Sequence, residues 1–175
     1  MGAFTNSIAF IPVPNEPATT RQTLDFQERN LSVYVSQLLG RDWSLAVRYR
    51  LSEARLTTRF PNLTGVSGVS ALEQNERALL HHGQLFLIYN HPCGFFGGWT
   101  SDWFHQSNHG YSPGLAGADF WQHNLFAGYV FPHRRAELRL GILNLADQDY
   151  RLNPLNLQSE LARRRTFTAS LRLNF

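Results

Sequence analysis

The sequence predicts an all-β fold, a transmembrane antiparallel up-and-down β-barrel, and three observations support this prediction. Within residues 165–175, polar and apolar side chains alternate strictly from Thr166 onward, which is the pattern of a two-faced strand. The alternation recurs along the chain in segments of about ten residues, the length that a tilted strand needs to cross a bilayer. The connections between these segments alternate between short turns and longer loops, as an up-and-down membrane barrel requires.

The alternation defines seven strands from residue 31 onward. Tight turns are expected at 40–42, 91–94 and 132–135, and longer loops at 60–75, 107–118 and 145–164. The strands between them are expected at 31–39, 43–52, 79–90, 95–106, 120–131, 136–143 and 165–175. We therefore assign 31–175 to the barrel strands.

Residues 1–30 give a weaker pattern. Residues 3–13 are a candidate eighth strand, but Pro12, Pro14 and Pro17 interrupt the region. The polar residues that follow predict a long loop up to Asn30. Seven or eight strands are thus expected in this chain. The beginning of the sequence shows no charged segment followed by an apolar one, so we expect a mature form or the C-terminal part of a larger barrel.

Composition agrees with a barrel and excludes several other classes of protein. No run of apolar residues approaches the ~18 that a membrane helix needs, so strands must make any crossing. All 16 basic residues are arginine and the net charge is +3, yet the arginines are scattered, with one run of three at 163–165. No nucleic-acid partner is therefore expected. The single cysteine excludes an internal disulfide.

Large aromatic residues on the expected outward face lie near the ends of the strands. Such residues form the girdles at the two membrane interfaces of a barrel. The alternative is the aromatic core of a soluble sandwich, but the outward sets alternate over nearly the length that spans a bilayer. The girdle candidates are Trp43, Tyr89, Phe95, Trp99, Trp103, Trp121, Tyr129 and Phe131.

Polar and charged residues occupy the opposite positions of the same strands. Two interpretations remain open: a cation-lined wall that favours anionic solutes, or charges that pair with neighbouring carboxylates. The lumen-facing candidates are Arg48, Arg50, Asp102, Gln122, Asn124, Glu137, Arg139 and Arg172.

Seven histidines raise the question of a metal or catalytic site. No pair has ligand spacing on one strand face, and no serine has a recognisable partner acid and base. We therefore expect no metal, no cofactor and no enzymatic activity, and we interpret the histidines as interfacial or loop residues.

The last part of the chain carries a short motif, Asn144-Leu145 followed by Asp147 and Tyr150, then an arginine run and the final strand. Residues 136–175 resemble the closing hairpin of a TonB-dependent receptor or a close barrel relative. The final strand resembles the signal by which bacterial outer-membrane barrels are recognised for insertion. The residues of this assembly signal are Phe167, Leu171, Leu173 and Phe175.

The resemblance implies a location in the bacterial outer membrane, contact with its lipid and insertion by the barrel-assembly machinery. It also implies uptake of a bulky solute such as a metal chelate, with energy coupled from the inner membrane, and further barrel strands or a plug elsewhere. The sequence shows neither a plug domain nor a TonB-contacting segment. A plugless barrel acting as an export or passive conduit is the first alternative. A stand-alone eight-stranded barrel, structural or enzymatic, is the second.

Overall fold

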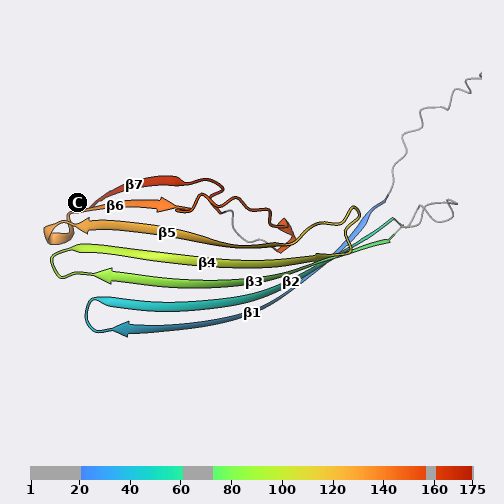
Figure 1. The fold of residues 1–175 in the computed structure, drawn as a ribbon, viewed down its shortest axis with the longest axis horizontal. Helices are drawn as coiled ribbons and strands as arrows, with labels where there is room; N and C mark the ends of the chain where they lie inside the picture. The colour runs from blue at the N-terminus through green and yellow to red at the C-terminus, as the bar shows by residue number, and fades with distance from the viewer. Residues whose placement is uncertain (1–20, 61–72, 157–160, 175) are drawn as a thin grey trace, which may run out of the picture.

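Seven strands form one antiparallel sheet in which each strand pairs with its neighbours in sequence (Figure 1). The computed structural model describes residues 21–60, 73–156 and 161–174. The strands are β1 (Thr23–Leu39), β2 (Trp43–Arg59), β3 (Glu73–Asn90), β4 (Phe95–His109), β5 (Ala118–Val130), β6 (Ala136–Leu143) and β7 (Thr166–Leu173). Two short 3-10 helices, η2 (Pro132–Arg134) and η3 (Pro154–Asn156), lie in the connections. The all-β, up-and-down prediction is confirmed.

The short turns all lie at one end of the sheet, here called the turn side (Figure 1). Gly40 and Gly94 have φ angles of 72° and 100°, which glycine adopts without steric cost. A Cβ atom at Gly94 would also collide with the carbonyl oxygen of Val130, so this turn requires glycine. The predicted turns at 40–42, 91–94 and 132–135 are confirmed.

Strands β1 to β5 all extend further toward the long loops than the sequence pattern predicts, and β4 and β5 take residues 107–109 and 118 from the expected loop at 107–118. Residues 23–30 were expected in a loop, but they belong to β1 and pair with residues 52–59 of β2. Strand β3 likewise begins at Glu73, within the expected loop at 60–75.

Residues 73–77 are polar on both faces, so no alternation marks the start of β3. In β1, Leu24 and Phe26 lie on the polar face, out of phase with Leu31 and Val33, so the apolar alternation of the later residues does not continue into this segment. At the turn side, β5 is one residue shorter than predicted, because it ends at Val130 and leaves Phe131 in the turn.

Strands β1 and β7 are the two edges of the sheet, and the sheet is not closed within the described ranges. Both strands are exposed along their whole length. A closed barrel is therefore not formed by these seven strands. The candidate strand at 3–13 lies outside the described residues. In the described part of the chain, no helix is long and apolar enough to cross a membrane.

The two faces of the sheet differ in chemistry. Residues of successive strands that pair in the sheet lie on the same face. One such row, on the apolar face, consists of Leu45, Leu87, Trp99, Leu125, Ile142 and Phe167. A row on the opposite, polar face consists of Arg48, Gln84, Asp102 and Gln122.

Candidate functional site

The apolar face carries a group of aromatic rings at the turn side. The rings of Trp43 and Tyr89 lie 4.7 Å apart, and that of Phe95 lies 6.4 Å from Tyr89. Tyr129 pairs with Phe95 in the sheet and packs edge-on against Phe131, with 5.2 Å between the ring centroids. These five residues, from four strands and one turn, are the turn-side aromatic row.

A second group, the loop-side aromatic row, crosses β2 to β5 nearer the long loops. It consists of Tyr49, His81, Trp103, Trp121 and His123. Consecutive ring centroids are 6.2 Å, 6.5 Å, 6.3 Å and 6.3 Å apart. The Tyr49 hydroxyl is also hydrogen-bonded to Nδ1 of His81 at 2.7 Å. Three residues of this row were not among the predicted girdle residues: Tyr49, His81 and His123. Each lies an even number of positions from an apolar-face residue of its own strand, so the alternation also places it on this face.

Polar atoms in and beside the loop-side row have partners within the sheet. Nε1 of Trp103 donates to Asp119 at 3.0 Å, and His105 contacts the same carboxylate at 3.1 Å. Ser101 and His123 are hydrogen-bonded at 2.9 Å, but Ser101 is only 2 % exposed, so the pair fastens β4 to β5 without presenting a nucleophile. Among the described residues, no group of histidine, cysteine and acidic side chains is arranged to hold a metal ion.

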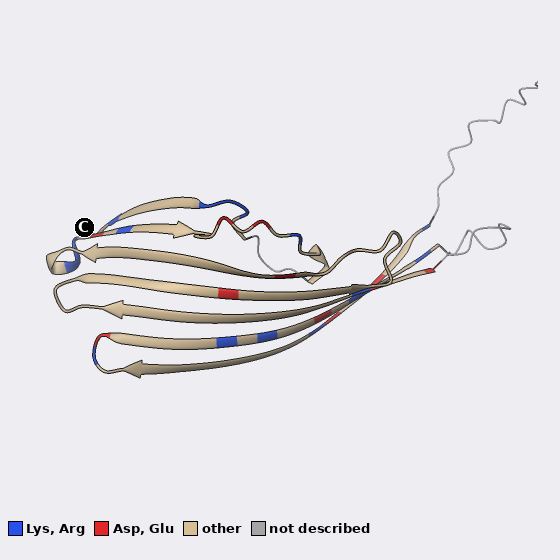
Figure 2. Cartoon of the chain, viewed as in Figure 1, with Lys and Arg blue, Asp and Glu red and all other residues tan. Residues whose placement is uncertain are grey.

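The two rows are separated by an apolar band. Tyr89 and His81 are roughly 26 Å apart along β3, at about 3.3 Å per residue. Large apolar side chains in this band are exposed, with Val47 at 47 % and Leu125 at 46 %. Along β1 to β5, charged residues are few in the turn-side half of the strands (Figure 2). All predicted girdle residues that belong to strands lie on this face. Trp99 lies within the apolar band and not in either row. Phe131 lies in the β5–β6 turn and packs against Tyr129 of the turn-side row.

Beyond the loop-side row, the same face becomes charged. Glu53 accepts a hydrogen bond from Arg55 at 2.6 Å and forms an ion pair with Nε of Arg77 at 2.7 Å. The hydrogen bonding of Arg55 lowers the pKa of this carboxyl, which lies outside the apolar band, and Arg77 and Arg29 lower the pKa further through their charge. Glu53 is therefore ionised at neutral pH, and it forms ion pairs with arginines of two adjacent strands, β2 and β3.

The predicted lumen-facing residues all lie on the polar face, as the strand register shows. They do not gather at one place. Arg48 and Arg50 belong to β2, whereas Arg139 and Arg172 belong to β6 and β7, with three strands between.

Several of these charges have partners on the polar face. Arg50 lies 3.7 Å from Glu28, and Asp102 accepts from Gln84 at 2.6 Å. The guanidinium of Arg139 stacks over Phe126 at 4.0 Å. The arginines are thus spread over a wall instead of forming a single cationic cluster.

The connection between β6 and β7 folds back onto the polar face near the loop ends. The Asn156 side chain in η3 donates to the carbonyl oxygens of Ser52 and Ala78 at 3.1 Å and 3.2 Å. Gln106 is 2 % exposed and binds the Asn153 backbone through both ends of its amide, at 2.6 Å and 3.1 Å. This segment, described at 144–156 and 161–165, is called the folded-back loop. It is pinned to β2, β3 and β4 by buried polar groups.

The short motif at 144–150 explains how the loop turns back. Asn144 is fully buried, and its side chain binds the backbone of Gln148 and of Ala162. Asp147 accepts from the Arg165 backbone at 2.8 Å. The Tyr150 ring stacks on Phe120 with 5.5 Å between centroids, and its hydroxyl donates to Leu161 at 2.9 Å. The motif therefore serves to hold the loop against the sheet.

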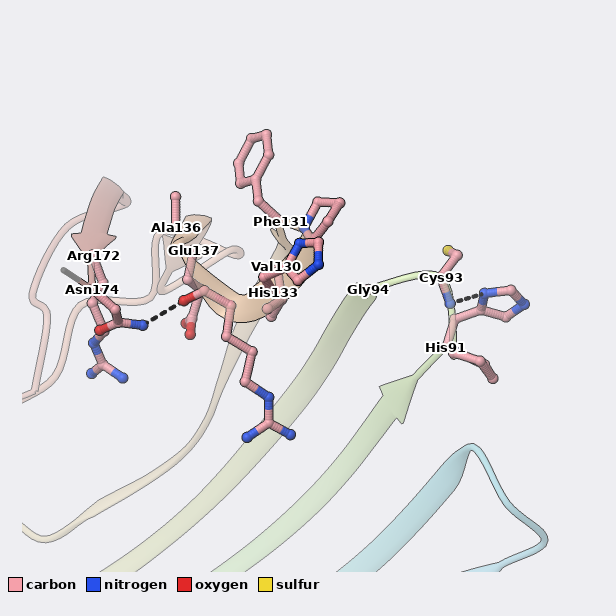
Figure 3. A pocket seen from close by; sticks show the side chains of 13 residues that line it. His91, Cys93, Gly94, Val130, Phe131, His133, Ala136, Glu137, Arg172 and Asn174 are labelled. Carbon is pink, nitrogen blue, oxygen red and sulfur yellow. Dashed lines mark hydrogen bonds between the residues drawn. The ribbon is translucent and has the colours of Figure 1, made fainter.

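A cavity of about 720 Å³ lies at the turn side, between two turns and the end of β7 (Figure 3). His91, Cys93, His133, Glu137 and Arg172 are among its lining residues. Beside it, the Asn174 side chain donates to the carbonyl oxygen of Arg134 at 2.7 Å and ties the end of the final strand to the preceding turn.

The described residues of the predicted assembly signal share the apolar face. Phe167, Leu171 and Leu173 are 73 %, 64 % and 53 % exposed, and Phe175 lies outside the described residues. Comparisons with protein-family models, with curated proteins and with solved structures found no match for this chain.

Proposed function

We propose that this chain is an outer-membrane β-barrel segment of a transporter similar to a TonB-dependent receptor, which takes up a bulky solute. The apolar face meets lipid and the polar face lines the lumen. The observation that supports this most strongly is the apolar band bounded by two aromatic rows. Interfacial aromatics flanking an apolar band are typical of the outer surface of membrane barrels. The roughly 26 Å between the rows along β3 corresponds to about 20 Å along the bilayer normal at a strand tilt of about 40°.

A soluble β-sandwich accounts less well for the same face. In a sandwich, a second sheet covers the apolar side chains and packs about 10 Å away. Here the described strands form one sheet, and Val47, Leu125, Leu140 and Phe167 on its apolar face are 47 %, 46 %, 54 % and 73 % exposed. Lipid provides a cover of the required chemistry over the whole band.

The open edges of the sheet require additional strands in the proposed barrel. Unpaired backbone groups in hydrocarbon cost several kcal/mol each, so β1 and β7 must pair with strands outside the described sheet. Those strands belong to another part of the same polypeptide or to another chain. This requirement favours a barrel larger than the described sheet.

The folded-back loop favours a second candidate function, a plugless barrel acting as an export or passive conduit. The loop covers part of the polar face and is fixed there by Gln106, Asn144 and Asn156. A barrel narrowed by its own loop needs no separate plug to restrict passage. In this alternative, the folded-back loop sets the width of the conduit.

Two measurements test these proposals in sequence. The detergent-solubilised protein should show β-type circular dichroism and gel mobility that changes on heating, and a monodisperse detergent-free soluble protein would end the membrane proposal. For the protein in its native membrane, dissipating the inner-membrane potential should abolish solute uptake if transport is energy-coupled. Transport that continues unchanged would favour the passive conduit instead.

A further inference from the structure

A small hollow lies on the polar face, over the turn-side half of β1, β2 and β3. Its volume is about 240 Å³, and its lining includes Tyr34 of β1, Ala46 and Arg48 of β2, and Phe86 and Ile88 of β3. Tyr34 is the sheet partner of Arg48, and Ala46 is the sheet partner of Phe86, so these side chains project on one face. This space is called the Arg48 hollow.

Small residues of β2 produce the hollow. Ala46 pairs with Ser36 in β1 and with Phe86 in β3, and Ser44 pairs with Ile88. Because the short side chains extend less far from the sheet than their neighbours in β3, Phe86 and Ile88 form an apolar wall on that side. An apolar cavity of about 150 Å³ is large enough to bind benzene. The hollow therefore has room for one aromatic ring.

Arg48 places a positive charge at this hollow that no neighbouring carboxylate balances. Its guanidinium carbon lies 5.6 Å from the ring centroid of Tyr34, and the residue is exposed. Among the described residues, no carboxylate forms an ion pair with Arg48, and no acidic residue lines the hollow. Arg50, two positions further along β2, differs because Glu28 lies 3.7 Å from it.

Two other carboxylates of this region lie away from the hollow. Asp102 is on the polar face two strands from Arg48, a distance of roughly 10 Å at the usual strand spacing. It is buried, accepts a hydrogen bond from Gln84 at 2.6 Å and lies 3.1 Å from His82. Asp42 lies in the β1–β2 turn, roughly 20 Å from Arg48 along β2. A solute in the hollow therefore meets a cation without a facing anion.

We propose that the Arg48 hollow binds a small aromatic anion, with its ring against Phe86 and Ile88 and its carboxylate or phosphate against Arg48. Guanidinium groups bind such oxyanions through paired, charge-assisted hydrogen bonds. An uncharged apolar solute is a poorer fit, because it would cover the Arg48 guanidinium without giving it a partner. The proposal rests on the proposed function, and it names the class of solute that passes along the polar face.

The test measures binding of 4-fluorophenyl phosphate to the purified full-length protein in micelles of a neutral detergent, from the broadening of its fluorine NMR signal. A ligand of this size is expected to bind at roughly millimolar concentration. The R48Q variant should bind at least about fivefold more weakly than the wild type. The control R41Q removes the same charge from the β1–β2 turn, and its affinity should stay within about twofold. Binding by R48Q at wild-type strength, or no broadening beyond that in empty micelles, would overturn the proposal.

A second pair of variants tests the position of the ring. A46L keeps Arg48 but fills part of the hollow, so it should also bind the probe severalfold more weakly. The matched control A127L makes the same substitution on the apolar face and should bind like the wild type. Equal binding by A46L and the wild type would overturn the proposal.

Two competing ligands separate the contribution of the ring from that of the charge. Inorganic phosphate and 4-fluorophenol each carry one of the two features, so neither should displace the probe appreciably at equal concentration. Displacement by phosphate would indicate a simple anion site, displacement by the phenol would indicate a simple apolar site, and either result would overturn the proposal. Circular dichroism and heat-modifiable mobility of the same samples test the membrane barrel separately, so failure of the proposed function is distinguishable from failure of ligand binding.

Discussion

The side-chain amide of Gln106 in β4 donates a hydrogen bond of 2.7 Å to the side-chain oxygen of Asn156 in η3. Both residues are buried, at 2 % and 3 % exposed, and they are 50 positions apart in the sequence. Because Asn156 in turn binds the backbone of β2 and β3, this bond fixes the folded-back loop across three strands. A loop held by buried polar groups is expected to be rigid and sensitive to the loss of a single partner.

Gln106→Met should release the folded-back loop. The substitution keeps the length of the side chain but removes the hydrogen bonds of Gln106 to the Asn153 backbone and to the side-chain oxygen of Asn156, at a cost of about 1–3 kcal/mol for each buried group left unpaired. Trypsin should therefore cleave after Arg151 faster in this variant than in the wild type, in detergent-solubilised folded protein. The matched control is Gln37→Met, since Gln37 is exposed and binds only the adjacent Leu38 carbonyl. Identical cleavage rates for Gln106→Met and the wild type would show that the loop is held by other contacts.

Val47→Arg should destabilise the protein in a bilayer far more than Ala46→Arg. The two positions are adjacent in β2 but lie on opposite faces, with Val47 near the middle of the apolar band. Placing an arginine on the lipid face at mid-bilayer costs about 2–4 kcal/mol. Ala46 instead borders a hollow of about 240 Å³ on the polar face, which accommodates a long side chain.

Denaturant titration of both variants folded into lipid vesicles measures this difference. Equal stabilities would mean that the apolar face does not contact lipid. A larger loss for Ala46→Arg would indicate that the polar face is the one in contact with lipid.

Cys93 is an exposed thiol in the β3–β4 turn and provides a reporter of topology. In intact cells, a membrane-impermeant maleimide should leave Cys93 unlabelled, because short turns of outer-membrane barrels face the periplasm. The double variant Cys93→Ser with Gly114→Cys moves the thiol to the β4–β5 loop, where a Cβ atom meets nothing within 4 Å. This variant should be labelled in intact cells, and both proteins should be labelled after lysis. Labelling of Cys93 alone before lysis would reverse the assigned orientation.

The strands and their two faces could be predicted because an apolar face imposes a period of two on the sequence. The predicted strand bounds were wrong where the apolar face of a strand carries polar residues. In residues 23–30, Leu24 and Phe26 alternate on the polar face while the positions of the apolar face are polar or charged, so the phase of the pattern breaks before Leu31 and only pairing with β2 reveals one continuous strand. The sequence alone therefore marks the apolar band more clearly than the full length of the strands.

The folded-back loop and the ion pairs of Glu53 could not be predicted, because both depend on the register between strands. Asn156 binds carbonyl oxygens of Ser52 and Ala78, which are 104 and 78 positions away. Arg77 of β3 reaches Glu53 of β2 only because the two long strands pair with the observed offset. The motif from Asn144 to Tyr150 was identified from its residue types, whereas its role in anchoring the loop required the fold.

Deletion of Phe175 should impair assembly into the membrane more than Phe126→Ala. The prediction rests on the alternating apolar residues Phe167, Leu171 and Leu173 of β7, which lie exposed on the apolar face and resemble the insertion signal of outer-membrane barrels. Phe126 is also aromatic, but it lies on the polar face beneath the Arg139 guanidinium. Removing its ring costs packing within the sheet and leaves the recognition of the final strand intact.

The measurement is the folded, heat-modifiable fraction of each variant in isolated outer membranes, compared with the total protein synthesised. Deletion of Phe175 should lower this fraction severalfold while the purified variant still folds in detergent, because a defect in recognition acts before folding. Phe126→Ala should lower the stability of the folded protein and change the membrane yield little. Strand β7 is held at its end by Asn174, whose backbone and side chain donate to the turn at Arg134 and Arg135, so the loss of one further residue leaves this anchor in place. Equal membrane yields for the two variants would show that the final strand is not the assembly signal.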